Sequence, residues 1–136
     1  MAQNGLAPYT VKKIDEMEAS FLGSFKRARA ELGVTSFGMA VIDLPANNDL
    51  YPEHDHGEDG QEEVYMALSG EGEIDIEGER FPVTTDSMIR VGPGVKRKVT
   101  TGDQPMRMLV LGGIPGGLYE PGPNSVLGTP DPMAAG

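Results

Sequence analysis

The stretch that decides the fold is His54–Gly70, which reads HDHGEDGQEEVYMALSG. His54 and His56 lie two residues apart, so on an extended strand both imidazoles point to the same face. The turn-rich segment GEDG then connects them to a second extended run at 62–68. If the two runs pair as a hairpin, the carboxylate of Glu63 meets both imidazoles.

Two histidines and one carboxylate with open positions are the ligand set expected for Fe(II), and the same set suits Mn, Ni or Zn. The sequence therefore indicates a divalent metal held by His54, His56 and Glu63. The alternative is that two surface histidines in an acidic loop bind nothing.

The spacing of these residues resembles the first motif of the cupin superfamily. That motif runs as Gly, five residues, His-x-His, three or four residues, Glu, six residues and Gly. The pair His54-x-His56 matches it, and so does Glu63 followed by six residues and Gly70. The chain departs from the motif at Asn48, which stands at the leading Gly, and in the six residues between the second His and the Glu. The extra residues fall at a turn, where insertions are tolerated.

The second cupin motif supplies a third histidine, and this chain has Arg97 in its place. The motif runs as Gly, five residues, Pro-x-Gly, two residues, His, three residues and Asn, and here only Gly94 matches it. Alternation in Val95–Val99 places Arg97 on the face of the valines, inside the barrel. Three interpretations stay open: Arg97 pairs with Glu63, it holds a ligand carboxylate or phosphate at the pocket mouth, or it bends out to solvent.

The resemblance implies an all-β fold, an antiparallel jelly-roll β-barrel with a short helical N-terminal flank. Short strands separated by frequent turn signals also indicate a sandwich or barrel. We expect residues 1–34 to pack on the barrel, residues 35–113 to form it, and residues 114–136 to be a Pro/Gly-rich tail. The resemblance places a ligand pocket inside the barrel, with Arg97, Tyr65 and Met88 as ligand-binding residues.

The N-terminal flank carries a helical pattern. Apolar residues recur there at spacings of three and four, namely Ile14, Met17, Phe21, Phe25, Ala28 and Leu32. Gly23 interrupts this pattern, which therefore predicts short helical pieces within 14–32 rather than one long helix. Gly33 is predicted to cap the last piece.

Composition restricts the partners. The chain has 136 residues, no cysteine and a formal net charge of −10, so it is most simply one domain without disulfides. A surface of that charge repels nucleic acid and anionic lipid. No apolar run approaches the ~20 residues that a membrane helix needs, and no secretory signal is recognised at the N-terminus. We therefore expect a cytoplasmic protein with no nucleic acid or membrane partner.

Two runs are apolar on both faces, at 35–44 and 62–68, which is more than one barrel interior needs. This predicts a homodimer. Two functions remain open for the pocket. In the first, the protein is a metal-dependent enzyme acting on a small molecule, such as an oxygenase or isomerase. In the second, it is a metal-free, non-catalytic binder or sensor in which Arg97 pairs with Glu63 or with an anionic ligand.

Overall fold

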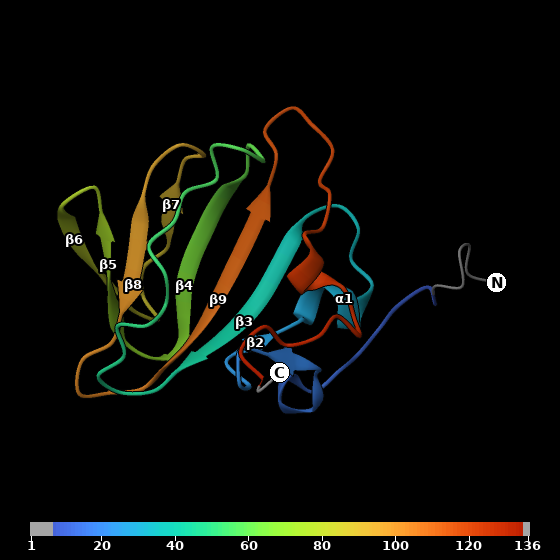
Figure 1. The fold of residues 1–136 in the computed structure, drawn as a ribbon, viewed down its shortest axis with the longest axis horizontal. Coiled ribbons are helices and arrows are strands. Elements are labelled where there is room, and N and C mark those ends of the chain that lie inside the picture. The colour runs from blue at the N-terminus through green and yellow to red at the C-terminus, as the bar shows by residue number, and fades with distance from the viewer. Residues whose placement is uncertain (1–6, 135–136) are drawn as a thin grey trace.

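The computed structural model describes residues 7–134 and consists mainly of antiparallel strands in two sheets (Figure 1). The strand order is β1-β2-β3-β9-β4-β7 in the larger sheet and β6-β5-β8 in the smaller one. The all-β class predicted from the sequence is confirmed, with one short α-helix. The elements are η2 (Ile14–Glu16), β1 (Ala19–Ser20), β2 (Phe25–Lys26), α1 (Ala28–Leu32), β3 (Gly38–Leu44), β4 (Glu62–Gly70), β5 (Gly72–Ile76), β6 (Glu79–Val83), β7 (Ile89–Val91), β8 (Arg97–Thr100), β9 (Met106–Gly113) and η3 (Pro123–Ser125).

The hydrophobic core lies between the two sheets. Strand β9 shows why: its residues alternate between buried and half-buried along its whole length, so one face of the strand points inward. Its inward residues pair with inward residues of β3, as in Val110 with Ala40 and Met108 with Ile42. The buried apolar core consists of Ala40, Ile42, Leu44, Tyr65, Ala67, Ile74, Val83, Val91, Val99, Met106, Met108 and Val110.

The N-terminal flank is helical only at its two ends. The 3-10 turn η2 and helix α1 are the short pieces expected, and Gly33 caps α1 in the left-handed region, with its N–H donating to the carbonyls of Arg29 and Ala30. Between them the chain forms a hairpin instead, with β2 pairing with β3 through Phe25 and Ile42. The helical spacing was misleading here because pairing with the sheet edge outweighs local propensity.

The C-terminal tail is tied to this flank by two buried arginines. The Arg27 guanidinium, 2% exposed, donates to the carbonyls of Asn124 and Thr129 at 2.9 and 2.8 Å. The Arg29 guanidinium reaches the hydroxyl and carbonyl of Ser125 at 2.6 and 2.8 Å. The tail therefore returns to the N-terminal segment rather than extending away from the sheets (Figure 1). Within residues 7–134, the helices are too short and too polar to cross a membrane.

Candidate metal centre

His54 and His56 lie in the long connection from β3 to β4, and the backbone of β8 positions the first of them. His54 and Arg97 form an isolated antiparallel bridge, with N–H···O distances of 3.0 and 2.9 Å. The N–H of His56 donates to the carbonyl of Pro93 at 2.7 Å. The histidine run and the Glu63 run do not pair as a hairpin, because β4 pairs with β9 and β7. Glu63 instead faces the histidines from the larger sheet.

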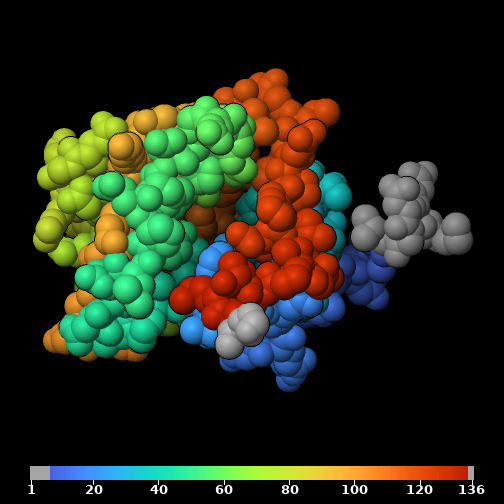
Figure 2. Space-filling view, in the orientation of Figure 1, coloured from blue at the N-terminus to red at the C-terminus, as the bar shows by residue number. Residues whose placement is uncertain are grey.

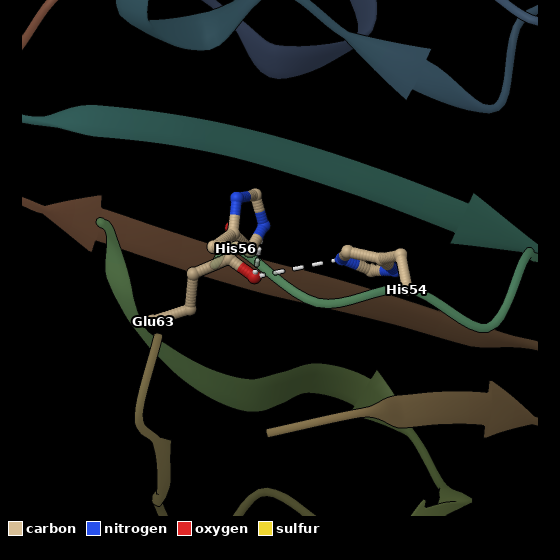
Figure 3. A group of neighbouring side chains, drawn as sticks. All are labelled: His54, His56 and Glu63. Carbon is tan, nitrogen blue, oxygen red and sulfur yellow. Dashed lines mark ion pairs between the residues drawn. The ribbon is translucent and has the colours of Figure 1, made fainter. Parts of the chain in front are cut away.

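The three side chains nevertheless converge (Figure 3). Oε1 of Glu63 lies 3.1 Å from Nε2 of His56 and 3.7 Å from Nε2 of His54. The three residues each offer a ligand atom within 4.8 Å of the others. The side chains are 27%, 19% and 13% exposed for His54, His56 and Glu63, so the group is sheltered but open to one side.

The Nδ1 atoms of both imidazoles are hydrogen-bonded, which leaves the two Nε2 atoms as the possible metal ligands. Nδ1 of His54 lies 3.1 Å from the carbonyl oxygen of Pro52, which only accepts, so Nδ1 carries the proton. Nδ1 of His56 lies 3.0 Å from the carboxylate of Asp59 in the same way. In the neutral rings both Nε2 atoms therefore present lone pairs towards Glu63. This is the outer-shell arrangement that metal-ligating histidines have.

The donor set fits a divalent cation. Nε2 of His56 is buried and has no hydrogen-bond partner in residues 7–134, although Oε1 of Glu63 lies 3.1 Å away. A proton on His56 or a divalent cation can match these lone pairs to the carboxylate. His54, His56 and Glu63 would hold such an ion, with two imidazole nitrogens and one carboxylate oxygen.

Glu63 is also held from behind by two fully buried residues. Arg97 donates to its Oε1 at 2.8 Å and the hydroxyl of Tyr65 donates at 2.6 Å. Both side chains are 0% exposed. The guanidinium also donates to the carbonyls of Val95 and Gly92, at 3.0 and 2.9 Å. The interpretation that pairs Arg97 with Glu63 is therefore confirmed, and the one that turns Arg97 to solvent is wrong.

These contacts shift the acid–base equilibria of the group. Burial opposes ionisation of Glu63, but His54, His56 and Tyr65 outweigh it and hold the pKa of Glu63 well below its ordinary value. The Glu63 carboxylate raises the pKa of His56 against the effect of burial, and Asp59 adds to the rise. Glu63 is thus ionised at neutral pH.

Two cavities meet at this group. The smaller, of about 640 Å³, is lined by His54, His56 and Glu63 and by the tail residue Tyr119. The larger, of about 1150 Å³, reaches the group at His54. Figure 2 shows this face of the molecule hollowed between the green segment of the β3–β4 connection and the orange-red C-terminal tail.

The structure changes the predicted lining of the pocket. Met88, predicted to bind the ligand, is 66% exposed and lines neither of these cavities. It precedes β7, whose inward residues are Ile89 and Val91, and strand alternation turns Met88 outward. Tyr65 and Arg97 lie behind Glu63 and support it, rather than lining either cavity.

Tyr51 is a site residue that the sequence did not predict. It lines both cavities, and its ring centroid lies 5.9 Å from that of His54. Burial and the nearby Glu63 carboxylate raise the pKa of Tyr51, which keeps its hydroxyl protonated. The segment before His54 reads as a turn cluster without a periodic pattern, so no signal in the sequence singled this tyrosine out.

Two facing antiparallel sheets with a His-His-Glu group between them define a cupin-type protein. A family model described as "Cupin domain" matches residues 41–112, more than half of the chain, and the protein therefore belongs to the cupin superfamily. The search of curated proteins gave no match.

Solved structures share the fold. A cupin protein from Bacteroides fragilis is 24% identical with a TM-score of 0.66, covering 86% of this chain and 93% of that one. A sugar phosphate isomerase of the cupin superfamily from Silicibacter pomeroyi is 19% identical with a TM-score of 0.62, covering 76% and 75%. The cupin domain of an XRE family transcriptional regulator from Enterobacter cloacae is 23% identical with a TM-score of 0.53, covering 61% and 86%.

Proposed function

We propose that this protein binds a small molecule inside the barrel together with a divalent metal ion held by His54, His56 and Glu63. One observation carries the proposal. Both imidazoles have Nδ1 engaged by an acceptor and turn Nε2 towards the same carboxylate oxygen, and the Nε2 of His56 is buried without a partner in the part of the chain that the structure describes.

The chain's own residues prepare this site. The Pro52 carbonyl and the Asp59 carboxylate fix the two ring orientations. Arg97 and Tyr65 hold the Glu63 carboxylate in one position. When bound, a divalent ion supplies a Lewis acid and a template for an oxygen or nitrogen of the ligand.

The proposal is binding, and the reaction is left unassigned. A metal-dependent enzyme such as an oxygenase or isomerase would use the same residues. The sugar phosphate isomerase that resembles this chain shares its fold at 19% identity, and a fold hosts many activities. The geometry therefore supports a metal-dependent small-molecule site and does not favour one reaction over another.

A second candidate is a metal-free binder or sensor, and Arg97 favours it. Its guanidinium lies 2.8 Å from Oε1 of Glu63 and is fully buried, so the charge of the carboxylate is already balanced. A cation beside a candidate metal ligand lowers metal affinity by repulsion. In this alternative the imidazoles contact the ligand directly.

Metal titration distinguishes the two candidates. Untagged protein, stripped with a chelator, is titrated with Co(II) and Zn(II) by calorimetry and by visible absorption for Co(II). We expect one site per chain, which His56→Ala removes. Glu53→Ala is the matched control, because Glu53 is exposed, lies beside His54 in sequence, and lines neither of the two cavities. Absence of binding, or equal binding in His56→Ala, would favour the metal-free candidate.

A further inference from the structure

The larger cavity is apolar along most of its length and polar where it meets the metal centre. Its apolar lining includes Phe21, Leu22, Phe25, Ile42, Leu44, Leu50 and Met106. Its volume of about 1150 Å³ slightly exceeds the roughly 300–1,000 Å³ of typical small-molecule pockets. Leu22 and Leu50 are 71% and 78% exposed, so both present apolar surface to solvent.

Segments outside the family match build one wall of this cavity. The cupin match covers residues 41–112, whereas residues 21–25 of the N-terminal hairpin and Asn124 and Met133 of the tail all line the cavity. Phe21 and Phe25 pack edge to face there, with centroids 5.9 Å apart. This wall therefore lies outside the residues that the family model matches.

The polar groups of the cavity indicate the head of the ligand. Asp43 and Arg107 line it but are paired with each other at 2.8 Å, so neither offers a free charge. At the other end, Tyr51 and His54 open onto the metal centre, where the charges of Glu63 and Arg97 cancel. A divalent ion there keeps open positions and favours an anionic oxygen ligand.

The smaller cavity is a poor entrance for an anion. Glu58, Asp59 and Glu120 line it, and all three are exposed acidic residues. In the larger cavity the paired Asp43 is the only carboxylate among the lining residues that the structure describes. An anionic ligand therefore enters along the apolar path.

We propose that the larger cavity binds an apolar small molecule carrying one carboxylate, with its apolar body between the N-terminal hairpin and the β3–β4 connection and its carboxylate at the metal centre beside His54. This inference rests on the proposed function, since the head group needs the metal. Burying each methylene of the body contributes about 0.8 kcal/mol.

The test uses straight-chain carboxylates as probes. Zn(II)-loaded protein is titrated by calorimetry with butanoate, hexanoate and octanoate, and with 1-octanol. We expect affinity to rise roughly fourfold per methylene, which is the burial energy expressed as a ratio of affinities. We expect 1-octanol to bind at least about tenfold more weakly than octanoate, since it lacks the anionic oxygen.

Two rim variants locate the body of the ligand. Leu22→Asp and Leu50→Asp should each weaken octanoate about tenfold and leave butanoate within about twofold, because only the longer body reaches the rim. Leu22 has a φ of 57°, a conformation that Asp adopts more readily than Leu, so this variant should fold. Leu118→Asp is the control, since Leu118 is 88% exposed and lines neither cavity.

The outcomes separate this inference from the proposed function. Zn(II) binding with no gain in affinity from butanoate to octanoate would overturn the inference and leave the metal site standing. Chain-length dependence that is equal with and without Zn(II) would support the apolar cavity but overturn the contact of the carboxylate with the metal. A loss of octanoate affinity in Leu118→Asp equal to that in Leu22→Asp and Leu50→Asp would overturn the placement of the ligand.

Discussion

Arg97→Ala is the most informative single change, because it removes one partner of a buried ion pair. The guanidinium is 0% exposed and donates to Oε1 of Glu63 at 2.8 Å, to the hydroxyl of Tyr65 at 3.2 Å, and to two backbone carbonyls. Its removal leaves a carboxylate whose side chain is 13% exposed without its counterion.

The expected cost is about 3–5 kcal/mol, the range for breaking a buried pair by removing one partner. The lower end of the range is favoured, since Tyr65 still donates to Glu63 and a protonated His56 can replace part of the lost charge. The free energy of unfolding is measured by urea denaturation at pH 7, with the slope checked for constancy.

Arg90→Ala is a matched control, because Arg90 of β7 pairs with Glu62, the neighbour of Glu63 in β4. Arg90 pairs with Glu62 at 3.2 Å, and the two side chains are 65% and 39% exposed. An exposed pair of this kind contributes about 0–1 kcal/mol. Equal losses in the two variants, or a loss below about 1 kcal/mol in Arg97→Ala, would refute the assignment of Arg97 as the buried counterion of Glu63.

Arg97→His extends the same reasoning to metal affinity. It places an imidazole at the position of the third cupin histidine and removes a cation that repels a metal ion. We expect Ni(II), Zn(II) or Fe(II) to bind at least about tenfold more tightly than in the parent protein, as measured by calorimetric titration. Equal or weaker binding would show that Arg97 does not occupy the vacant ligand position.

Three further predictions follow from other parts of the molecule. Zn(II) at a hundred times its dissociation constant should add about 2.7 kcal/mol of stability, a melting shift of roughly 5–10 °C, and His54→Ala should abolish it. We expect a homodimer through the outer face of the larger sheet, which Met66→Glu should dissociate; light scattering that gives 14.5 kDa for the parent would contradict it. Burial opposes ionisation of Asp43, but Arg107 outweighs it and holds the pKa of Asp43 below its ordinary 3.8. Stability from Asp43 is therefore complete above that value and lost as pH falls through the folded pKa, so urea unfolding of Asp43→Asn should depend less steeply on pH below about 4.

The fold class and the centre of the site could be predicted because their signals are local. The His-x-His spacing and the glutamate seven residues later match a known motif, which predicts that the three side chains converge. Alternation in Val95–Val99 is enough to predict that Arg97 points inward. The same alternation in β4 separates Tyr65, which is buried, from its outward neighbours. An alternating pattern predicts which residues are buried wherever one face of a strand packs on the core and the other faces solvent.

What could not be predicted depends on contacts between distant segments. The helical spacing through Phe21 and Phe25 gave way to a hairpin because β2 pairs with β3, where Phe25 lies opposite Ile42, a residue outside the helical pattern. The backbone of His54 pairs with that of Arg97 in β8 and not with the strand that follows His54 in the sequence. No local pattern indicates this pairing. Tyr51 enters the site because the irregular connection folds over the sheet.

The N-terminal hairpin and the C-terminal tail form one wall of the larger cavity, and hydrogen bonds between the two segments hold them together. A buried guanidinium is costly unless its donors are matched, and Arg27 and Arg29 find most of their acceptors in the tail, at Asn124, Ser125 and Thr129. Residues 114–134 of the tail include no buried side chain, and these hydrogen bonds hold the tail against the N-terminal segment. Because the hairpin and the tail both line the larger cavity, the buried arginines that join them also fix the wall against which the proposed ligand would pack.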